Sequence, residues 1–273
     1  MEGISLADAA LHCLTICDPE EKINATQQVA QIWKEDKLTI SSPSTYSAQL
    51  IPGLPQILRL VAPKYLSRRK LHSLEGKAAF IHAIAHIEFN AINLAWDAIY
   101  RFQGLPEAFY SHWIQVAAEE AHHFYLLNIH LHSLGYQYGD FLAHNGLWEM
   151  AEKTAYDPMV RMALVPRVLE ARGLDVTPSM IERLRAIGDL RAIAILEIIF
   201  RDEINHVAIG SYWFRYFCKI RNLNPEDTFS SLIRQFFKSI PKGALNYDAR
   251  LKAGFSKQEL MMLVQNQNIL STP

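Results

Sequence analysis

The sequence predicts an all-α protein with a four-helix bundle at its centre. Four long segments between about residues 73 and 222 repeat apolar residues at helical spacing, and none alternates as a strand would. Two segments contain a Glu-x-x-His motif, and a lone glutamate precedes each motif in the segment before it. Since residues three apart share a helix face, four such helices could bring these groups to a pair of metal ions. The six residues are Glu88, Glu120, His123, Glu170, Glu203 and His206.

The N-terminal region, residues 1–72, is predicted to form two short helices and an extended arm. The helices are expected over residues 6–15 and 19–33, with Asp18 and Pro19 as a start signal between them. Residues 39–70 contain four prolines and few helical repeats, so we expect an arm that wraps the outside of the main domain. A short basic cluster, Arg68 to Lys70, is expected to be solvated.

The bundle domain is predicted over residues 73–222. Its helices are expected over 73–102, 106–134, 147–172 and 178–221, and glycines or prolines mark their ends. A glycine-containing crossover, 135–146, separates the second helix from the third. Pro158 and Pro166 interrupt the third helix, while Thr177 and Pro178 are taken as the start signal of the fourth.

The C-terminal extension, residues 223–273, is predicted to pack on the bundle. Two helices are expected over 225–240 and 256–267, with a basic loop over 241–255. This segment could cap the site and attract an anionic substrate, and a solvated tail is the simpler alternative. The residues concerned are Lys242, Tyr247, Arg250 and Lys252.

Helical angles separate inward from outward carboxylates. Glu88 lies within about 40° of Ile81, Ile92 and Ile99, in the middle of an apolar stripe. A carboxylate in that position must be paired, protonated or metal-bound, because an isolated buried charge is very costly.

The same angles choose one Glu and one His in each motif. Glu120 and His123 share a face with apolar residues, whereas Glu119 is about 100° away and His122 points nearly backward. Glu203 and His206 are inward by the same argument. Asp202 is displaced, and could accept a hydrogen bond from a ligand histidine. Arg167 lies one turn before Glu170 and could pair with it or its neighbours.

The two halves match in spacing, since 32 residues separate Glu88 from Glu120 and 33 separate Glu170 from Glu203. This indicates a diverged duplication of a helix pair. A single Glu-x-x-His is weak evidence, but two of them with matched upstream glutamates are strong evidence for a dimetal site. A helical bundle with satisfied polar core groups is the alternative.

A second set of polar residues follows the opposite face of the first bundle helix. His82 and His86 are four residues apart and could bind a metal, but a polar outer face or packing on another segment is the more ordinary explanation. No tyrosine lies at the centre of a ligand face, so the sequence gives no support for a tyrosine that exchanges electrons with the metals.

Composition favours a cytoplasmic protein. The net charge is −1 and only three of the 273 residues are cysteines, which suits a reducing compartment better than a disulfide framework. The near-neutral charge does not favour nucleic acid or an anionic membrane as a partner. We therefore expect no membrane span and no signal peptide, and the sequence leaves a homodimer open.

Around the motif residues the chain resembles the ferritin-like superfamily, and more closely an uncharacterised bacterial family described by its ferritin-like domain. The resemblance covers about residues 50–260. It implies a left-handed four-helix bundle with a long crossover, a two-iron or two-manganese centre, and the six residues above as ligands. A bacterial tRNA hydroxylase is similar in its metal motif. The matching stretches are His82–Glu88, Val116–Phe124, Gly146–Met150, Val165–Asp175 and Asp202–Gly210.

Three functions are consistent with the sequence. The first is an O2-activating di-iron oxidase or oxygenase, with an unknown small-molecule substrate and electron donor; tRNA is a disfavoured substrate. Trp113, Phe124 and Phe200 could line its pocket, although they could equally be ordinary core aromatics. The second is a ferroxidase or iron-handling protein, and the third is a non-enzymatic binding module with a structural metal.

Overall fold

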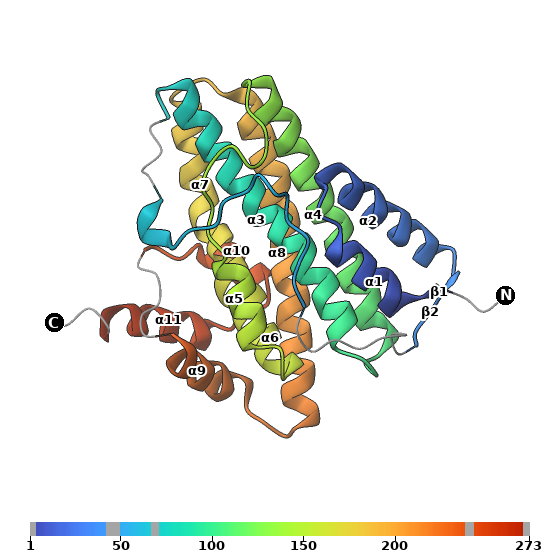
Figure 1. Ribbon diagram of the computed structural model, residues 1–273. Coiled ribbons are helices and arrows are strands. Elements are labelled where there is room, and N and C mark those ends of the chain that lie inside the picture. The colour runs from blue at the N-terminus through green and yellow to red at the C-terminus, as the bar shows by residue number, and fades with distance from the viewer. Residues whose placement is uncertain (1–3, 42–49, 67–70, 238–242, 270–273) are drawn as a thin grey trace. The chain divides into compact units, whose positions relative to one another are not determined.

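The computed structural model describes residues 4–41, 50–66, 71–237 and 243–269, and side chains as far as residue 265. Over these residues the protein is helical, apart from the two-residue parallel strands β1 (Ile4–Ser5) and β2 (Leu38–Thr39) (Figure 1). This confirms the prediction of an all-α protein. The chain divides into two compact units, residues 1–148 with 187–195, and residues 149–186 with 196–273.

The first unit is built on an antiparallel pair of long helices, α3 (Leu74–Arg101) and α4 (Glu107–Ser133). A short turn through Gly104 joins them. Helix α1 (Leu6–Thr15) packs on α3, and helix α2 (Pro19–Lys34) packs on α4; Figure 1 shows α1 and α2 in blue, α3 in teal and α4 in green. The predicted N-terminal helices and the first two bundle helices are therefore confirmed.

Helix α3 is buried on all sides in its second half. Ser73 caps its first turn by accepting a hydrogen bond from the Gly76 amide, and every residue from Glu88 to Tyr100 is buried. A helix with one polar and one apolar face can be buried all round only if the polar face finds partners. Here the N-terminal helices and the crossover supply them.

Lys22 is the clearest of these partners. Its ammonium group is fully buried and donates to the carbonyl oxygens of Cys13 and Leu14 at 2.7 and 2.8 Å, and to Asn93 Oδ1 at 2.7 Å. The first two acceptors belong to the last turn of α1, where carbonyl groups have no helical partner. One side chain of α2 therefore ties the end of α1 to the polar face of α3.

The arm lies against the crossover in the first unit. Leu60 forms an isolated bridge with Ala143, and residues 50–66 contain no α-helix, only a turn at Gln56 and Ile57 and the short 3-10 helix Pro63–Tyr65. An added Cβ on Gly53 would lie 2.1 Å from the Ile16 carbonyl oxygen, so only glycine permits this close approach to the end of α1. That the arm wraps the outside of the main domain stays a prediction.

The second unit is also helical. It contains most of α5 (Gly146–Lys153), α6 (Pro158–Leu164), a π-helical segment (Val165–Glu170) and α7 (Ala171–Arg185). It continues with helix α8 (Leu190–Ile220) from Leu196 onward. Three shorter helices complete it: α9 (Pro225–Phe236), α10 (Tyr247–Lys252) and α11 (Lys257–Ile269).

The boundary predicted between the third and fourth bundle helices is wrong. The chain stays helical through Gly173 and Pro178, and the break falls at residues 186–189, where Gly188 has φ +71° and Asp189 accepts from the Ala192 amide. Pro178 removes the amide that would bond the Leu174 carbonyl. Asn246 Nδ2 donates to that carbonyl instead, at 3.2 Å, so the helix tolerates the proline.

The C-terminal loop prediction also needs correction, since α10 occupies part of residues 241–255. The predicted helix 225–240 ends at Phe236 as α9. The basic cluster Arg68 to Lys70 and Lys242 lie outside the described residues. None of the helices in the described part of the chain combines the length and hydropathy needed to cross a bilayer.

Replacing Lys22 tests the link between α1, α2 and α3. Lys22→Met keeps the aliphatic volume but leaves three buried acceptors without a donor, so we expect the free energy of unfolding to fall by about 2–4 kcal/mol. Lys34→Met, at the exposed end of the same helix, is the control and should change it by less than about 0.5 kcal/mol. Urea unfolding of both variants measures the difference, and equal small effects would contradict the assigned role.

Candidate metal centre

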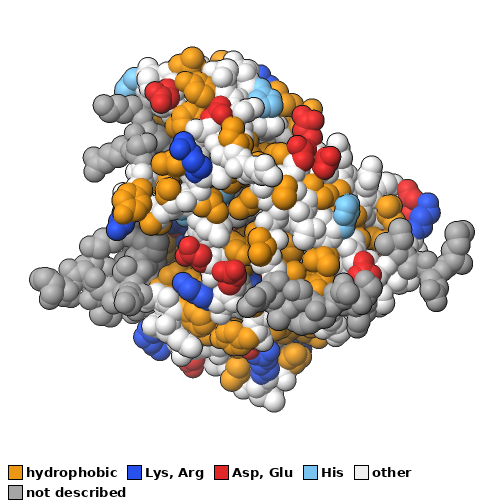
Figure 2. All heavy atoms as spheres, in the orientation of Figure 1, with side chains coloured by type: hydrophobic (Ala, Val, Ile, Leu, Met, Phe, Trp, Pro, Cys, Tyr) orange, Lys and Arg blue, Asp and Glu red, His pale blue; other side chains and the backbone are white. Residues whose placement is uncertain are grey.

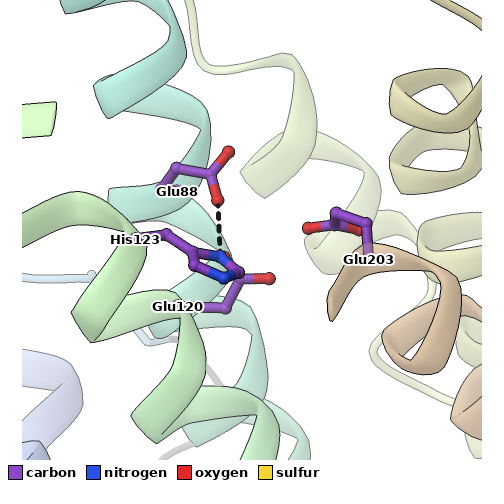
Figure 3. A group of neighbouring side chains, drawn as sticks. All are labelled: Glu88, Glu120, His123 and Glu203. Atoms are coloured by element: carbon purple, nitrogen blue, oxygen red, sulfur yellow. Dashed lines mark hydrogen bonds and ion pairs between the residues drawn. The ribbon is translucent and has the colours of Figure 1, made fainter. Parts of the chain in front are cut away.

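Three ligand-type side chains meet in the first unit. Glu88 comes from α3, and Glu120 and His123 come from α4 (Figure 3). His123 Nδ1 lies 3.1 Å from Glu88 Oε2 and 3.3 Å from Glu120 Oε2. Each residue offers one ligand atom, and these atoms lie within 4.8 Å of one another. Their exposed fractions are 3%, 1% and 0%, so the group lies in the core.

The neighbouring Glu and His of the same motif lie elsewhere. His122 is exposed, and Glu119 is half-buried and accepts a hydrogen bond from Gln115 Nε2 at 2.9 Å. The 100° turn per residue thus separates the two pairs, as the angular argument predicted.

The electrostatics of the three groups are unusual for a metal-free core. Burial, together with the neighbouring Glu120 carboxylate, raises the pKa of Glu88 to about 8. Burial by itself lowers the pKa of His123, but its ring can donate hydrogen bonds to the Glu120 and Glu88 carboxylates, and these bonds and charges outweigh burial and raise that pKa well above its usual value. Without a metal, the group therefore holds protons that an exposed group would release at neutral pH.

The donor set fits a divalent metal ion. Two carboxylates and one imidazole supply oxygen and nitrogen ligands, a combination that suits iron, manganese or zinc better than calcium or copper(I). A cation would replace the retained protons and remove the repulsion between the two carboxylates. The three residues present could therefore hold a metal ion.

The second unit contains the matching pair. Glu203 and His206 lie three residues apart on α8, with His206 Nδ1 at 3.6 Å from Glu203 Oε1. His206 is fully buried, and Glu203 Oε2 is a buried oxygen without a hydrogen-bond partner in the described structure. Glu170 is the last residue of the π-helical segment and is half-buried. The six predicted residues thus fall into two sets of three, one in each unit.

Arg167 has a different partner from the one expected. It donates from Nη2 to Glu259 Oε1 at 2.6 Å and from Nε to Ser211 Oγ at 3.1 Å, and it does not pair with Glu170. Its guanidinium group lies 4.2–4.7 Å from three ring centroids, those of Phe214, Phe229 and Phe255. Glu259 is 92 residues away in the sequence, which is why spacing on one helix could not identify it.

The aromatic residues predicted to line a pocket differ in burial. Trp113 and Phe124 are buried, and Phe124 packs edge-on against Phe89 at 5.0 Å. Phe200 is half-buried. The place of these three aromatic residues in a substrate pocket stays a prediction. Asp202 accepts a hydrogen bond from Arg201 Nε at 2.8 Å, and its predicted role as acceptor for a ligand histidine also stays a prediction.

The C-terminal residues predicted to attract an anion are partly engaged. Arg250 is buried and donates to both carboxylate oxygens of Asp175, at 2.9 and 2.8 Å. Its charge is therefore neutralised inside the second unit. Lys252 is exposed and Tyr247 is largely exposed, as in the solvated tail that was the alternative.

The polar face of α3 packs against another segment, as one of the interpretations held. His82 Nε2 accepts a hydrogen bond from the Gly139 amide at 2.9 Å. Both ring nitrogens of His86 are also engaged, Nδ1 with Tyr138 Oη at 2.7 Å and Nε2 with the His144 carbonyl oxygen at 3.0 Å. The two histidines therefore bind the crossover. Tyr138 is the residue that sequence reasoning missed, since the crossover has no period that could place it.

Comparison with known proteins identifies the family. The model of a family described as "Protein of unknown function (DUF455)" matches residues 15–261. The chain belongs to the DUF455 family. An uncharacterized protein of Haemophilus influenzae (strain ATCC 51907 / DSM 11121 / KW20 / Rd) is 45% identical over 276 residues, covering 95% of this chain and 93% of that protein. No solved structure matches the chain.

The retained proton on Glu88 predicts a pH-dependent stability for the metal-free DUF455 protein. A pKa raised in the folded state stabilises the fold fully below about pH 4.5, and this contribution is lost as the pH rises to about 8. Glu88→Gln mimics the protonated form. As the pH rises from about 4.5 to about 8, the unfolding free energy of the full chain should therefore decrease by roughly a few kcal/mol relative to that of Glu88→Gln.

The measurement is chemical unfolding in the presence of a chelator across that pH range. Glu75→Gln, at an exposed position on the same helix, is the control and should follow the full chain. If the difference between the full chain and Glu88→Gln did not change with pH, Glu88 would not hold the proton.

Proposed function

We propose that this DUF455 protein is a dimetal carboxylate oxidoreductase that uses O2 to oxidise an organic substrate, with iron as the first candidate metal and manganese as the second. The observation that supports it most is the buried group of Glu88, Glu120 and His123, in which two carboxylates lie in the core beside one imidazole. Such a group is stable only if cations or protons neutralise it.

The second half of the proposed centre comes from Glu170, Glu203 and His206. The partnerless buried oxygen of Glu203 and the repeated Glu-x-x-His spacing support this assignment. Helix α8, Leu190–Ile220, carries both Glu203 and His206. Joining the two sets of three in one ferritin-like four-helix bundle is part of the proposal.

The roles of the protein groups follow from their surroundings. When bound, the two ions would supply the one-electron chemistry that O2 requires. Glu88, Glu120 and His123 would hold and orient one side of the centre, and burial of the group would exclude bulk water. Phe124 and Trp113 would keep the surroundings apolar, so that a substrate replaces water when it enters.

A nucleic-acid substrate receives less support from the surface. On the face drawn in Figure 2, described lysine and arginine side chains are interspersed with aspartate and glutamate side chains. Binding to phosphate backbones uses clustered positive charge. A small-molecule substrate therefore suits this face better than tRNA does.

Adjacent residues on α4 provide a matched test of the metal ligands. His123→Ala and Glu120→Ala remove proposed ligands, and Glu203→Ala removes one from the second unit; each should lower the metal content per chain. His122→Ala and Glu119→Ala change the neighbouring residues of the same motif and should keep the full metal content. Plasma mass spectrometry on purified protein gives the values, and full metal content in His123→Ala and Glu203→Ala would contradict the ligand set.

Oxygen consumption separates the oxygenase from iron handling. The iron-loaded protein should consume O2 beyond a single turnover only when a reductant and an organic substrate are added. The reductant returns the metal ions to their reduced state, and the substrate is what each turnover oxidises. Continued consumption with Fe2+ alone would instead identify a ferroxidase. No consumption in any mixture would leave a structural metal.

A further inference from the structure

The proposed ligand Glu170 is the last residue of the π-helical segment Val165–Glu170. Pro166, near the start of this segment, has no backbone amide, so the Met162 carbonyl cannot receive the usual hydrogen bond from four residues further on. The chain adopts wider turns there, and such π-helical turns are rare and are frequently found at functional sites. Contacts with neighbouring elements must stabilise them, and the same contacts decide where Glu170 lies.

The first of these contacts joins the π-helical segment to helix α8. An added Cβ on Gly210 would lie 2.4 Å from Pro166 Cγ, so only glycine lets the proline ring approach the α8 backbone this closely. Gly210 is seven residues after Glu203 and four after His206, which places it about 20° and about 40° from them around the helix. Pro166 therefore packs on the face of α8 that carries both proposed ligands.

The second contact is made by the next residue, Arg167, whose side chain is fully buried. Its Nε donates to Ser211 Oγ on α8 at 3.1 Å, and its Nη2 donates to Glu259 Oε1 on α11 at 2.6 Å. Three aromatic rings pack against the guanidinium group, those of Phe214, Phe229 and Phe255. Two helices thus hold one side chain of the π-helical segment.

The acceptor Glu259 is itself held on both carboxylate oxygens. While Oε1 accepts from Arg167, Oε2 accepts from the Ser256 amide at 2.7 Å and from Arg215 Nη2 at 3.3 Å. Ser256 Oγ accepts from the Glu259 amide at 3.1 Å, which completes a capping box at the start of α11. Glu259 is 1% exposed, so bulk water is excluded from these bonds. The first turn of α11 therefore gives Arg167 an acceptor in a defined position.

The energetics of this ion pair indicate a role beyond stability. Arg167 and Glu259 both lose their hydration in the core, and apolar residues of similar size often give equal or greater stability in place of such a pair. Apolar side chains do not supply direction, whereas the planar guanidinium group binds its acceptors at fixed angles. The pair therefore suits a place where the orientation of the backbone matters more than the gain in stability.

We propose that Arg167 and Glu259 are positioning residues for the metal ligand Glu170, an inference that rests on the proposed function. Their ion pair holds the π-helical segment against α8. Glu170 follows Arg167 by three residues, so its carboxylate is held toward Glu203 and His206. Helix α11 thereby helps to form the metal centre without supplying a ligand, and this gives the C-terminal extension a role other than attracting a substrate.

The test measures Fe2+ binding to the full metal-free chain by anaerobic isothermal titration calorimetry. The full chain should bind two ions. Glu259→Gln keeps the size of the side chain but removes the charge that holds Arg167, so it should weaken the binding of one ion by about 10- to 100-fold and leave the other nearly unchanged. Leu263→Ala, at a buried position on the same helix, is the control; it should lower the stability of the fold and keep both affinities.

A double variant separates positioning from stability. Arg167→Met/Glu259→Leu replaces the buried pair by apolar side chains, so its free energy of unfolding in urea should return close to that of the full chain while one ion stays weakly bound. Tight binding of both ions by Glu259→Gln or by the double variant would overturn the proposal, and so would an equal loss in Leu263→Ala. Absence of Fe2+ binding by the full chain would instead refute the proposed function, and this inference with it.

Discussion

Two carboxylates, Glu88 and Glu120, are buried beside each other and beside His123, and the rest of the structure depends on how that charge is neutralised. Like charges in a protein interior repel by several kcal/mol, far more than a surface ion pair contributes. In the metal-free chain the neutralising charges are protons. In the proposed holoprotein they are metal ions, which also provide a chemical reason for keeping such costly groups in the core.

The helix that carries Glu88, α3, is buried on both faces in its second half. It packs on α4 and α1, and groups on its polar face bond to α2 and to the crossover. Trp96 donates to Thr26 Oγ1 of α2 at 3.0 Å, and Lys22 and Gly139 satisfy other groups on the same face. The N-terminal helices and the crossover therefore stabilise the helix that carries a candidate ligand. Through Tyr138, the crossover also gives that helix its hydrogen-bonded phenol.

The predictions succeeded where a helical angle decides the answer and failed where a distant partner does. The turn of 100° per residue separated Glu120 from Glu119 without any tertiary information. It could not show that Asn246 would satisfy the Leu174 carbonyl and let the helix continue past Pro178. Nor could it show that Arg167 pairs with Glu259, or that the crossover brings a tyrosine to His86. Joining the two sets of three proposed ligands in one centre would require tertiary packing that spacing alone does not determine.

Anomalous diffraction at the iron edge from crystals of iron-loaded protein tests the dimetal centre most directly. The account predicts two peaks about 3.5–4 Å apart, the usual separation in two-metal sites. One peak should lie against Glu88, Glu120 and His123, and the other against Glu170, Glu203 and His206. A single peak away from these residues, or none after anaerobic loading with Fe2+, would contradict the dimetal centre.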